Sequence, residues 1–272
     1  MPEPAPRRGG APATPDPSGS DPSGLSAHGP SAAEGRTRRA FAAAGFASLF
    51  ASLLVFGVIA EDVHEQKAIA LDALATPWLH QLSSPALDGL MRAITALGST
   101  AIVAPLLVVA VAALLLSRHR RDALFLAVSI AGSVALNESL KLLIHRARPQ
   151  LAWAAVQSEF SFPSGHAMNG LVFYVALAAI TWRLWGRRIG SIAMALAVGL
   201  AFLIGTSRIY LGFHYLTDVA GGFLAGVAWL IVVAAAFDRR LRSRIRTRRD
   251  TGVDGVHNHL PRPDIPGRPQ QR

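Results

Sequence analysis

The stretch SFPSGHAMNGLVFYVALAAITWRL, Ser161–Leu184, joins a polar turn directly to a long apolar run. From Ala167 to Trp182 the run carries no charged residue. It approaches the length of about 20 residues that an α-helix needs to cross a bilayer. The Pro, Ser, Gly and His residues that precede it therefore lie at the mouth of a predicted membrane-spanning helix.

The composition of the whole chain is that of a membrane protein. Hydrophobic residues make up 51% of its 272 positions, and the mean hydropathy is +0.34. The net charge of +10 comes from basic residues at the ends of apolar runs, so the positive-inside rule explains it better than nucleic-acid binding. The chain has no cysteine, which excludes disulfides, iron–sulfur clusters and thiolate chemistry.

Apolar runs of similar length recur along the chain and predict an all-α, polytopic membrane bundle of six transmembrane helices. Between the first two runs, Leu, Ala and Trp are mixed with Asp72, His80, Asp88 and Arg92 at helical spacing. That segment predicts one or two amphipathic helices at the interface, with Trp78 at the level of the headgroups. The six runs cover about residues 40–60, 100–116, 123–144, 167–184, 189–206 and 219–237.

The two ends of the chain have another composition. Residues 1–38 are rich in Pro, Gly, Ala and Ser, and residues 241–272 are rich in Arg and Pro. Segments that bury so little apolar surface cannot offset the entropy lost on folding. We therefore expect a disordered tail at each end of a membrane domain at 39–240.

Basic clusters predict the orientation of the bundle. RTRRA, SRHRR, RLWGRR and DRRLRSRIRTRR all fall on one side of the membrane when six spans alternate. That side should be the cytoplasm, with both termini inside. The loops joining the third span to the fourth and the fifth to the sixth then lie at the outer face of a plasma membrane.

Three polar groupings lie at this predicted outer face. They are KLLIHRARP at Lys141–Pro149, PSGH at Pro163–His166, and SRIYLGFHYLTD at Ser207–Asp218. Charged groups at a membrane are costly unless they are paired or functional. Their shared side therefore indicates one site.

The first chemistry that these groupings suggest is anion binding. Lys141, Arg148 and Arg208 supply cations, and arginine matches phosphate oxygens with paired hydrogen bonds. Ser164 and Gly165 precede a helix, so backbone N–H groups and the positive helix end point towards a bound anion. This pattern predicts a phosphate site.

The second chemistry is nucleophilic. His214 and Asp218 are four residues apart and share a helical face, so the carboxylate can hold the imidazole in one tautomer. A histidine oriented in this way is a nucleophile or a base, and His166 near the same anion is a natural general acid. These residues suggest phosphoryl transfer through a phosphohistidine. A metal site of His166, His214 and Asp218 is disfavoured because three nearby cations oppose a divalent ion.

Taken together, the groupings resemble the signature of the type 2 phosphatidic acid phosphatase superfamily. That superfamily also contains the vanadium haloperoxidases and bacterial lipid pyrophosphate phosphatases. Its motif K-x6-RP is met at Lys141–Pro149, PSGH at Pro163–His166, and SR-x5-H-x3-D at Ser207–Asp218. The resemblance covers about residues 71–237 and leaves out both tails.

The resemblance implies a role for each motif residue. His214 would attack phosphorus, Asp218 would orient it, and His166 would protonate the leaving group. The phosphate oxygens would be held, without a metal or any other cofactor, by Lys141, Arg148, Ser164, Gly165 and Arg208. Arg146 lies inside the first motif, and it either adds a fourth cation to the site or faces headgroups.

The expected function is hydrolysis of a lipid phosphate or pyrophosphate at the outer membrane face. Undecaprenyl diphosphate, phosphatidic acid, phosphatidylglycerol phosphate and diacylglycerol pyrophosphate all fit, and the first two are favoured. A lipid phosphotransferase would use the same site. A haloperoxidase is disfavoured because those enzymes are soluble. A transporter or flippase is disfavoured because the polar residues gather at one face. The sequence does not indicate an oligomeric state.

Overall fold

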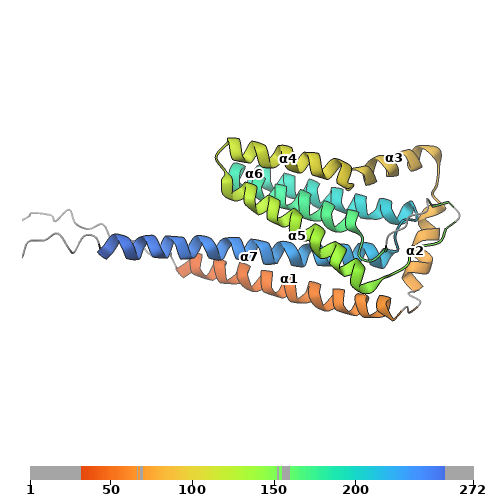
Figure 1. Ribbon diagram of the computed structural model, residues 1–272, viewed down its shortest axis with the longest axis horizontal. Coiled ribbons are helices and arrows are strands. Elements are labelled where there is room, and N and C mark those ends of the chain that lie inside the picture. Colours follow the sequence, from red (N-terminus) through yellow and green to blue (C-terminus); the bar gives the residue numbers. More distant parts are fainter. Residues whose placement is uncertain (1–31, 66, 68–69, 152, 155–159, 255–272) are drawn as a thin grey trace, which may run out of the picture. The chain divides into compact units, whose positions relative to one another are not determined.

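The computed structural model describes residues 32–65, 67, 70–151, 153–154 and 160–254, and this part of the chain is helical without any strand. The predicted all-α membrane fold is confirmed (Figure 1). The chain divides into two units, residues 1–43 and 44–272, and the described part of the first is the beginning of α1. The helices are α1 (Ala32–His64), α2 (Ala70–His80), α3 (Pro85–Ala96), α4 (Thr100–Leu116), α5 (Arg120–Ile144), α6 (Gly165–Tyr210) and α7 (Leu216–Asp254).

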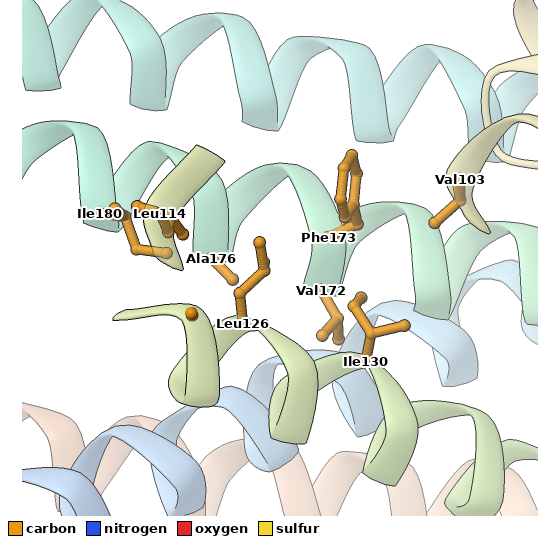
Figure 2. Packing of buried hydrophobic residues seen from close by; sticks show 9 residues of the cluster. Val103, Leu114, Leu126, Ile130, Val172, Phe173, Ala176 and Ile180 are labelled. Carbon is orange, nitrogen blue, oxygen red and sulfur yellow. The ribbon is translucent and has the colours of Figure 1, made fainter. Parts of the chain in front are cut away.

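Apolar side chains at helical spacing form the core between α4, α5 and α6. Leu126 and Ile130 project from one face of α5 towards Val172 and Ala176 of α6, as Figure 2 shows. All four are at most 6% exposed. Residues four apart lie on one face of a helix, so these pairs set α5 against α6 along their length.

Four of the described helices are long and apolar enough to cross a membrane. They are α5, α6 and the parts of α1 and α7 at Ala43–His64 and Leu216–Asp238. A fifth span results if α3 and α4, which bend by 44° at their junction, count as one broken span. The count of six stays a prediction.

The helix α6 contains both the fourth and the fifth predicted runs. At Gly186 the backbone has φ 82° and ψ −178°, which breaks the helical geometry. A methyl group added at Gly190 would lie 2.4 Å from Cα of Trp182, and one at Gly170 would lie 3.5 Å from Ile204. Because those residues are far apart along a straight helix, the second half of α6 must run back along the first (Figure 1).

The segment between the first two runs forms α2 and α3. Pro85 occupies the first turn of α3, and Ser84 caps it by accepting a hydrogen bond from the backbone N–H of Leu87 at 3.3 Å. The helix α2 packs on α6 and α7, and α3 packs on α6. Both therefore belong to the packed bundle, and the placement of Trp78 at headgroup level stays a prediction.

Helix extends into both expected tails. The first helix begins at Ala32, and α7 continues to Asp254 beyond the expected boundary at residue 240. Alanine and arginine are good helix formers, and extending an existing helix costs far less than starting one. The rest of the expected tails, residues 1–31 and 255–272, lies outside the described residues.

We expect Gly190→Ala to destabilise the protein by about 1–3 kcal/mol, because the added methyl group would force the two halves of α6 apart. Gly199→Ala is the matched control, since no neighbouring atom lies within 4 Å of the added carbon. Thermal unfolding in detergent measures both. Equal melting temperatures for the two variants would show that the close approach is not needed.

Candidate functional site

The predicted site residues come together at one end of the bundle, where α5 and the second half of α6 end and where α6 and α7 begin (Figure 1). Lys141 lies in the last turn of α5 and Arg208 in the last turn of α6. Ser164 and Gly165 open α6, and Asp218 lies in the first turn of α7. Residues that are far apart in sequence thus meet because these helices are antiparallel neighbours.

His214 and Asp218 form a buried pair. Nδ1 of His214 lies 3.2 Å from Oδ2 of Asp218, and both side chains are almost completely excluded from solvent. On the other side of the ring, Nη1 of Arg148 lies 3.2 Å from Nε2 of His214. A guanidinium can only donate, so Nε2 accepts, and the ring proton lies on Nδ1, facing the carboxylate. The lone pair of Nε2 therefore points into the cationic side of the site.

The surroundings of His214 keep its imidazole neutral. Burial lowers its pKa from the usual value of 6.5 to about 4, and the positive charges of Arg208 and Arg148 act in the same direction. The hydrogen bond and the charge of Asp218 raise the pKa and only partly offset these effects. At neutral pH, Nε2 thus retains the lone pair that a nucleophile requires.

Ser164 and Gly165 form a tightly held turn. The backbone N–H of Ser164 donates to the carbonyl of Asp218 at 2.9 Å, which ties the turn to α7. A methyl group at Gly165 would lie 3.0 Å from Oδ1 of Asn137. Nδ2 of Asn137 donates to the carbonyl of Pro163 at 3.2 Å, so Asn137 supports the turn from α5.

Arg208 is held between α3 and the loop that follows α6. Its Nη1 donates to Oγ1 of Thr95 at 3.3 Å, and its guanidinium carbon lies 4.4 Å from the centre of the Phe213 ring. It is only 4% exposed. Nε of Arg208 and Oγ of Ser164 are buried and have no hydrogen-bond partner among the described residues. Both can donate, and a buried donor without an acceptor is costly, so an anion complements them.

Lys141 and His166 complete the predicted set. Lys141 is 6% exposed, and its Nζ lies 3.1 Å from Oε1 of the more exposed Glu138. His166 is half-buried in the first turn of α6, beside Gly98 in the turn between α3 and α4. Lys141, Arg148, Arg208 and His214 are all near enough to interact with it electrostatically.

Two functional candidates were not expected from the sequence. Asp72 of α2 and Thr217 of α7 both contact Arg146, which was expected to add a cation or to face headgroups. Arg146 also donates to Oδ1 of Asp218, so its guanidinium is engaged by residues of α2 and α7. Asp72 sits in a segment predicted to be amphipathic, where a carboxylate on the polar face is ordinary, so its place in the sequence did not indicate a role in the site.

The described part of the chain has no group of three or more His, Cys, Asp or Glu side chains that could hold a metal ion. Asp218 is the carboxylate in contact with His214, and its oxygens already contact Arg146, His214 and the backbone N–H of Tyr215. Metal independence stays a prediction for experiment.

Comparison with known proteins agrees with this arrangement. The family model of the PAP2 superfamily matches residues 122–242, which include all three polar groupings. The chain is 31% identical to phosphatidylglycerophosphatase B of Bacillus subtilis over 191 residues, which are 70% of this chain and 94% of that protein. It is also 31% identical to the putative undecaprenyl-diphosphatase YbjG of Escherichia coli over 154 residues, 53% of this chain and 73% of the other.

One solved structure has a closely similar fold. It is the crystal structure of a transmembrane PAP2 type phosphatidylglycerolphosphate phosphatase from Bacillus subtilis. The TM-score is 0.66 at 31% sequence identity, and the match covers 71% of this chain and 96% of that one. The shared fold therefore extends well beyond the three motifs.

We expect Gly222→Ala to weaken the binding of inorganic phosphate by about 5- to 150-fold, because overpacking typically costs about 1–3 kcal/mol and here the strain falls on the anion-binding turn. The added carbon would lie 2.8 Å from the carbonyl oxygen of Ser164 and would displace the turn. At Gly226, on the same face of α7, the nearest atom is at the end of the Leu171 side chain, so Gly226→Ala should cost less. Calorimetry in detergent measures both affinities, and an unchanged affinity in Gly222→Ala would contradict the expectation.

Proposed function

The chain belongs to the PAP2 superfamily, and from that premise we propose that it hydrolyses a lipid phosphate or pyrophosphate through a phosphohistidine formed on His214. The observation that carries the proposal is the series Asp218–His214–Arg148, in which the first two side chains are buried and Arg148 is partly buried. A carboxylate holds Nδ1 of the imidazole, and a cation suited to binding phosphate lies beside Nε2. This order of groups supports attack by Nε2 on phosphorus.

In the first step Nε2 of His214 forms a bond to phosphorus while the bond from phosphorus to the leaving oxygen breaks. His166 gives that oxygen a proton, so the product leaves as a neutral alcohol or as a lipid phosphate. The negative charge on the phosphoryl oxygens is stabilised by the cations of the site and by the turn that opens α6. These groups are Lys141, Arg148, Arg208, Ser164 and Gly165.

In the second step a water molecule attacks the phosphohistidine. The water oxygen bonds to phosphorus, the bond from phosphorus to Nε2 breaks, and His166 takes the proton that the water loses. His214 regains its lone pair and phosphate leaves. Asp218 keeps the imidazole in place in both steps. In the phosphohistidine, where Nε2 is phosphorylated, it also stabilises the positive charge of the ring.

A lipid substrate fits the membrane setting of the site. The site residues lie at the ends of helices long enough to cross a bilayer, so a phosphate head can reach the cations while its tail stays in lipid. Phosphatidylglycerophosphate, undecaprenyl diphosphate and phosphatidic acid all meet this requirement. The basic loops favour a site at the outer face of the plasma membrane, with both termini in the cytoplasm.

We expect the purified protein to release phosphate in detergent with EDTA present, and His214→Ala to reduce that release to background, because no other group replaces the nucleophile. The panel of lipids is phosphatidylglycerophosphate, undecaprenyl diphosphate and phosphatidic acid. His119→Ala is the control, since His119 is 44% exposed at the opposite end of α5.

Normal release by His214→Ala would refute the phosphohistidine route. Loss of release in EDTA that returns on adding a divalent ion would refute metal independence. Transfer of the phosphoryl group to an added alcohol in place of water would identify a phosphotransferase.

We expect the acid limb of kcat/KM to lie well below pH 6.5, because His214 must be neutral to attack and its pKa is lowered to about 4. Activity is present above this pKa and is lost as the pH falls through it. The second ionisation of the substrate phosphate, near pH 6, is titrated separately in the same micelles and accounted for. An enzyme limb at about pH 6.5 or above would contradict the expectation.

A further inference from the structure

We propose that Arg146 and Asp72 are positioning residues for the reaction on His214, and that Arg146 holds the catalytic carboxylate of Asp218 without binding the substrate phosphate. This inference rests on the proposed function and assigns to the site a second buried carboxylate, from α2. It follows from the contacts of one guanidinium.

The guanidinium of Arg146 bridges two buried carboxylates. Nη1 donates to Oδ1 of Asp218 at 2.6 Å and to Oγ1 of Thr217 at 2.7 Å. Nη2 donates to Oδ2 of Asp72 at 2.7 Å. The side chains of Asp218 and Asp72 are 0% and 5% exposed, and that of Arg146 is 14% exposed. The rigid, planar guanidinium presents Nη1 to one carboxylate and Nη2 to the other, an arrangement that the single nitrogen of a lysine ammonium does not match.

These contacts leave the Asp218 carboxylate little freedom to rotate. Oδ1 accepts from Arg146, while Oδ2 lies 3.2 Å from Nδ1 of His214 and accepts from the backbone N–H of Tyr215 at 3.0 Å. The position of the imidazole is thus set by a carboxylate that is itself held at both oxygens. Loss of Arg146 would allow the carboxylate, and with it the ring, to change orientation.

Asp72 holds Arg146 and the start of α7 together. Its Oδ1 accepts from the backbone N–H of Thr217 at 2.9 Å, and its Oδ2 accepts from Oγ1 of Thr217 at 2.5 Å. Thr217 is next in sequence to Asp218, so α2 is joined to the first turn of α7, which carries Asp218. A buried carboxylate is expensive, and these contacts show what compensates for its burial.

The charges of this cluster also suit the intermediate. Asp72 and Asp218 with Arg146 sum to a net charge of −1 beside a ring that becomes positively charged when Nε2 is phosphorylated. On the Nδ1 side of the ring this net negative charge favours the positively charged imidazole of the phosphohistidine, opposite the cations Arg148 and Arg208 that act on the ring from elsewhere in the site. Burial lowers the pKa of Arg146, but the two carboxylates outweigh burial and raise it, so the guanidinium stays charged.

The test compares Arg146→Gln, Arg146→Lys and Asp72→Asn with the wild type, with Arg187→Gln as an exposed arginine control. We expect Arg146→Gln to lower kcat roughly 100-fold, the cost of a small misplacement of a reacting group. KM should stay within about twofold, because the phosphate keeps its contacts. Arg146→Lys should restore part of kcat, and Asp72→Asn should lower it less than Arg146→Gln does.

A second readout needs no turnover. The pKa of His214 is measured by NMR titration of protein labelled with ¹⁵N-histidine, with the signal assigned from its loss in His214→Ala. Asp218 faces this ring from α7, Arg148 from the segment after α5 and Arg208 from the end of α6, and His166 interacts with it from the start of α6. Lys141 of α5 acts on His166. Arg146→Gln should raise the pKa, because Asp218 is then no longer neutralised, and Asp72→Asn should not raise it.

The outcomes separate the inference from the function on which it rests. A wild-type kcat and an unmoved His214 pKa in Arg146→Gln would overturn the positioning role. A raised KM with unchanged kcat would also overturn it and would make Arg146 a phosphate ligand. If no lipid yields phosphate with the wild type, the proposed hydrolysis fails, and the titration still decides whether Arg146 and Asp72 set the state of His214.

Discussion

The contact on which the site depends is the one between the Asp218 carboxylate and the imidazole of His214. A carboxylate with no solvent exposure is stable only when its oxygens are occupied, and here they are occupied by groups from two other segments of the chain. Arg146 belongs to the connection after α5, and His214 and the backbone N–H of Tyr215 belong to the loop before α7. The same contacts that satisfy the charge therefore hold the nucleophile in place.

The bundle is shaped so that this contact can form. The reversal of α6 at Gly186 places its two ends at one level, so Ser164 and Arg208 lie on the same side of the bundle despite their separation in sequence. Small residues permit the close packing: Gly222 lies under the carbonyl of Ser164, and Gly205 lies against Phe223. Without side chains at these glycines, the anion-binding turn can rest directly on α7.

The site combines groups whose burial would be unfavourable one at a time. Arg208 and Arg148 lower the proton affinity of His214, while Asp218 supports it, so the ring stays neutral and correctly oriented. Nε of Arg208 and Oγ of Ser164 are buried and can donate, and neither has a hydrogen-bond partner in the part of the chain that the structure describes. A phosphate group supplies what these atoms need, and this complementarity is the physical basis of the proposed specificity for phosphate.

The sequence by itself determined the helical membrane class, the location of the apolar runs and the residues brought together at the site. Hydrophobic length and motif spacing are local properties that do not depend on packing. Only the tertiary structure decided where Arg146 points and that Asp72 reaches the site. Those contacts join residues more than 70 positions apart, and no periodicity along the chain encodes such pairings. Packing of α2 against α7 creates them, because a buried charge must find its partner in space.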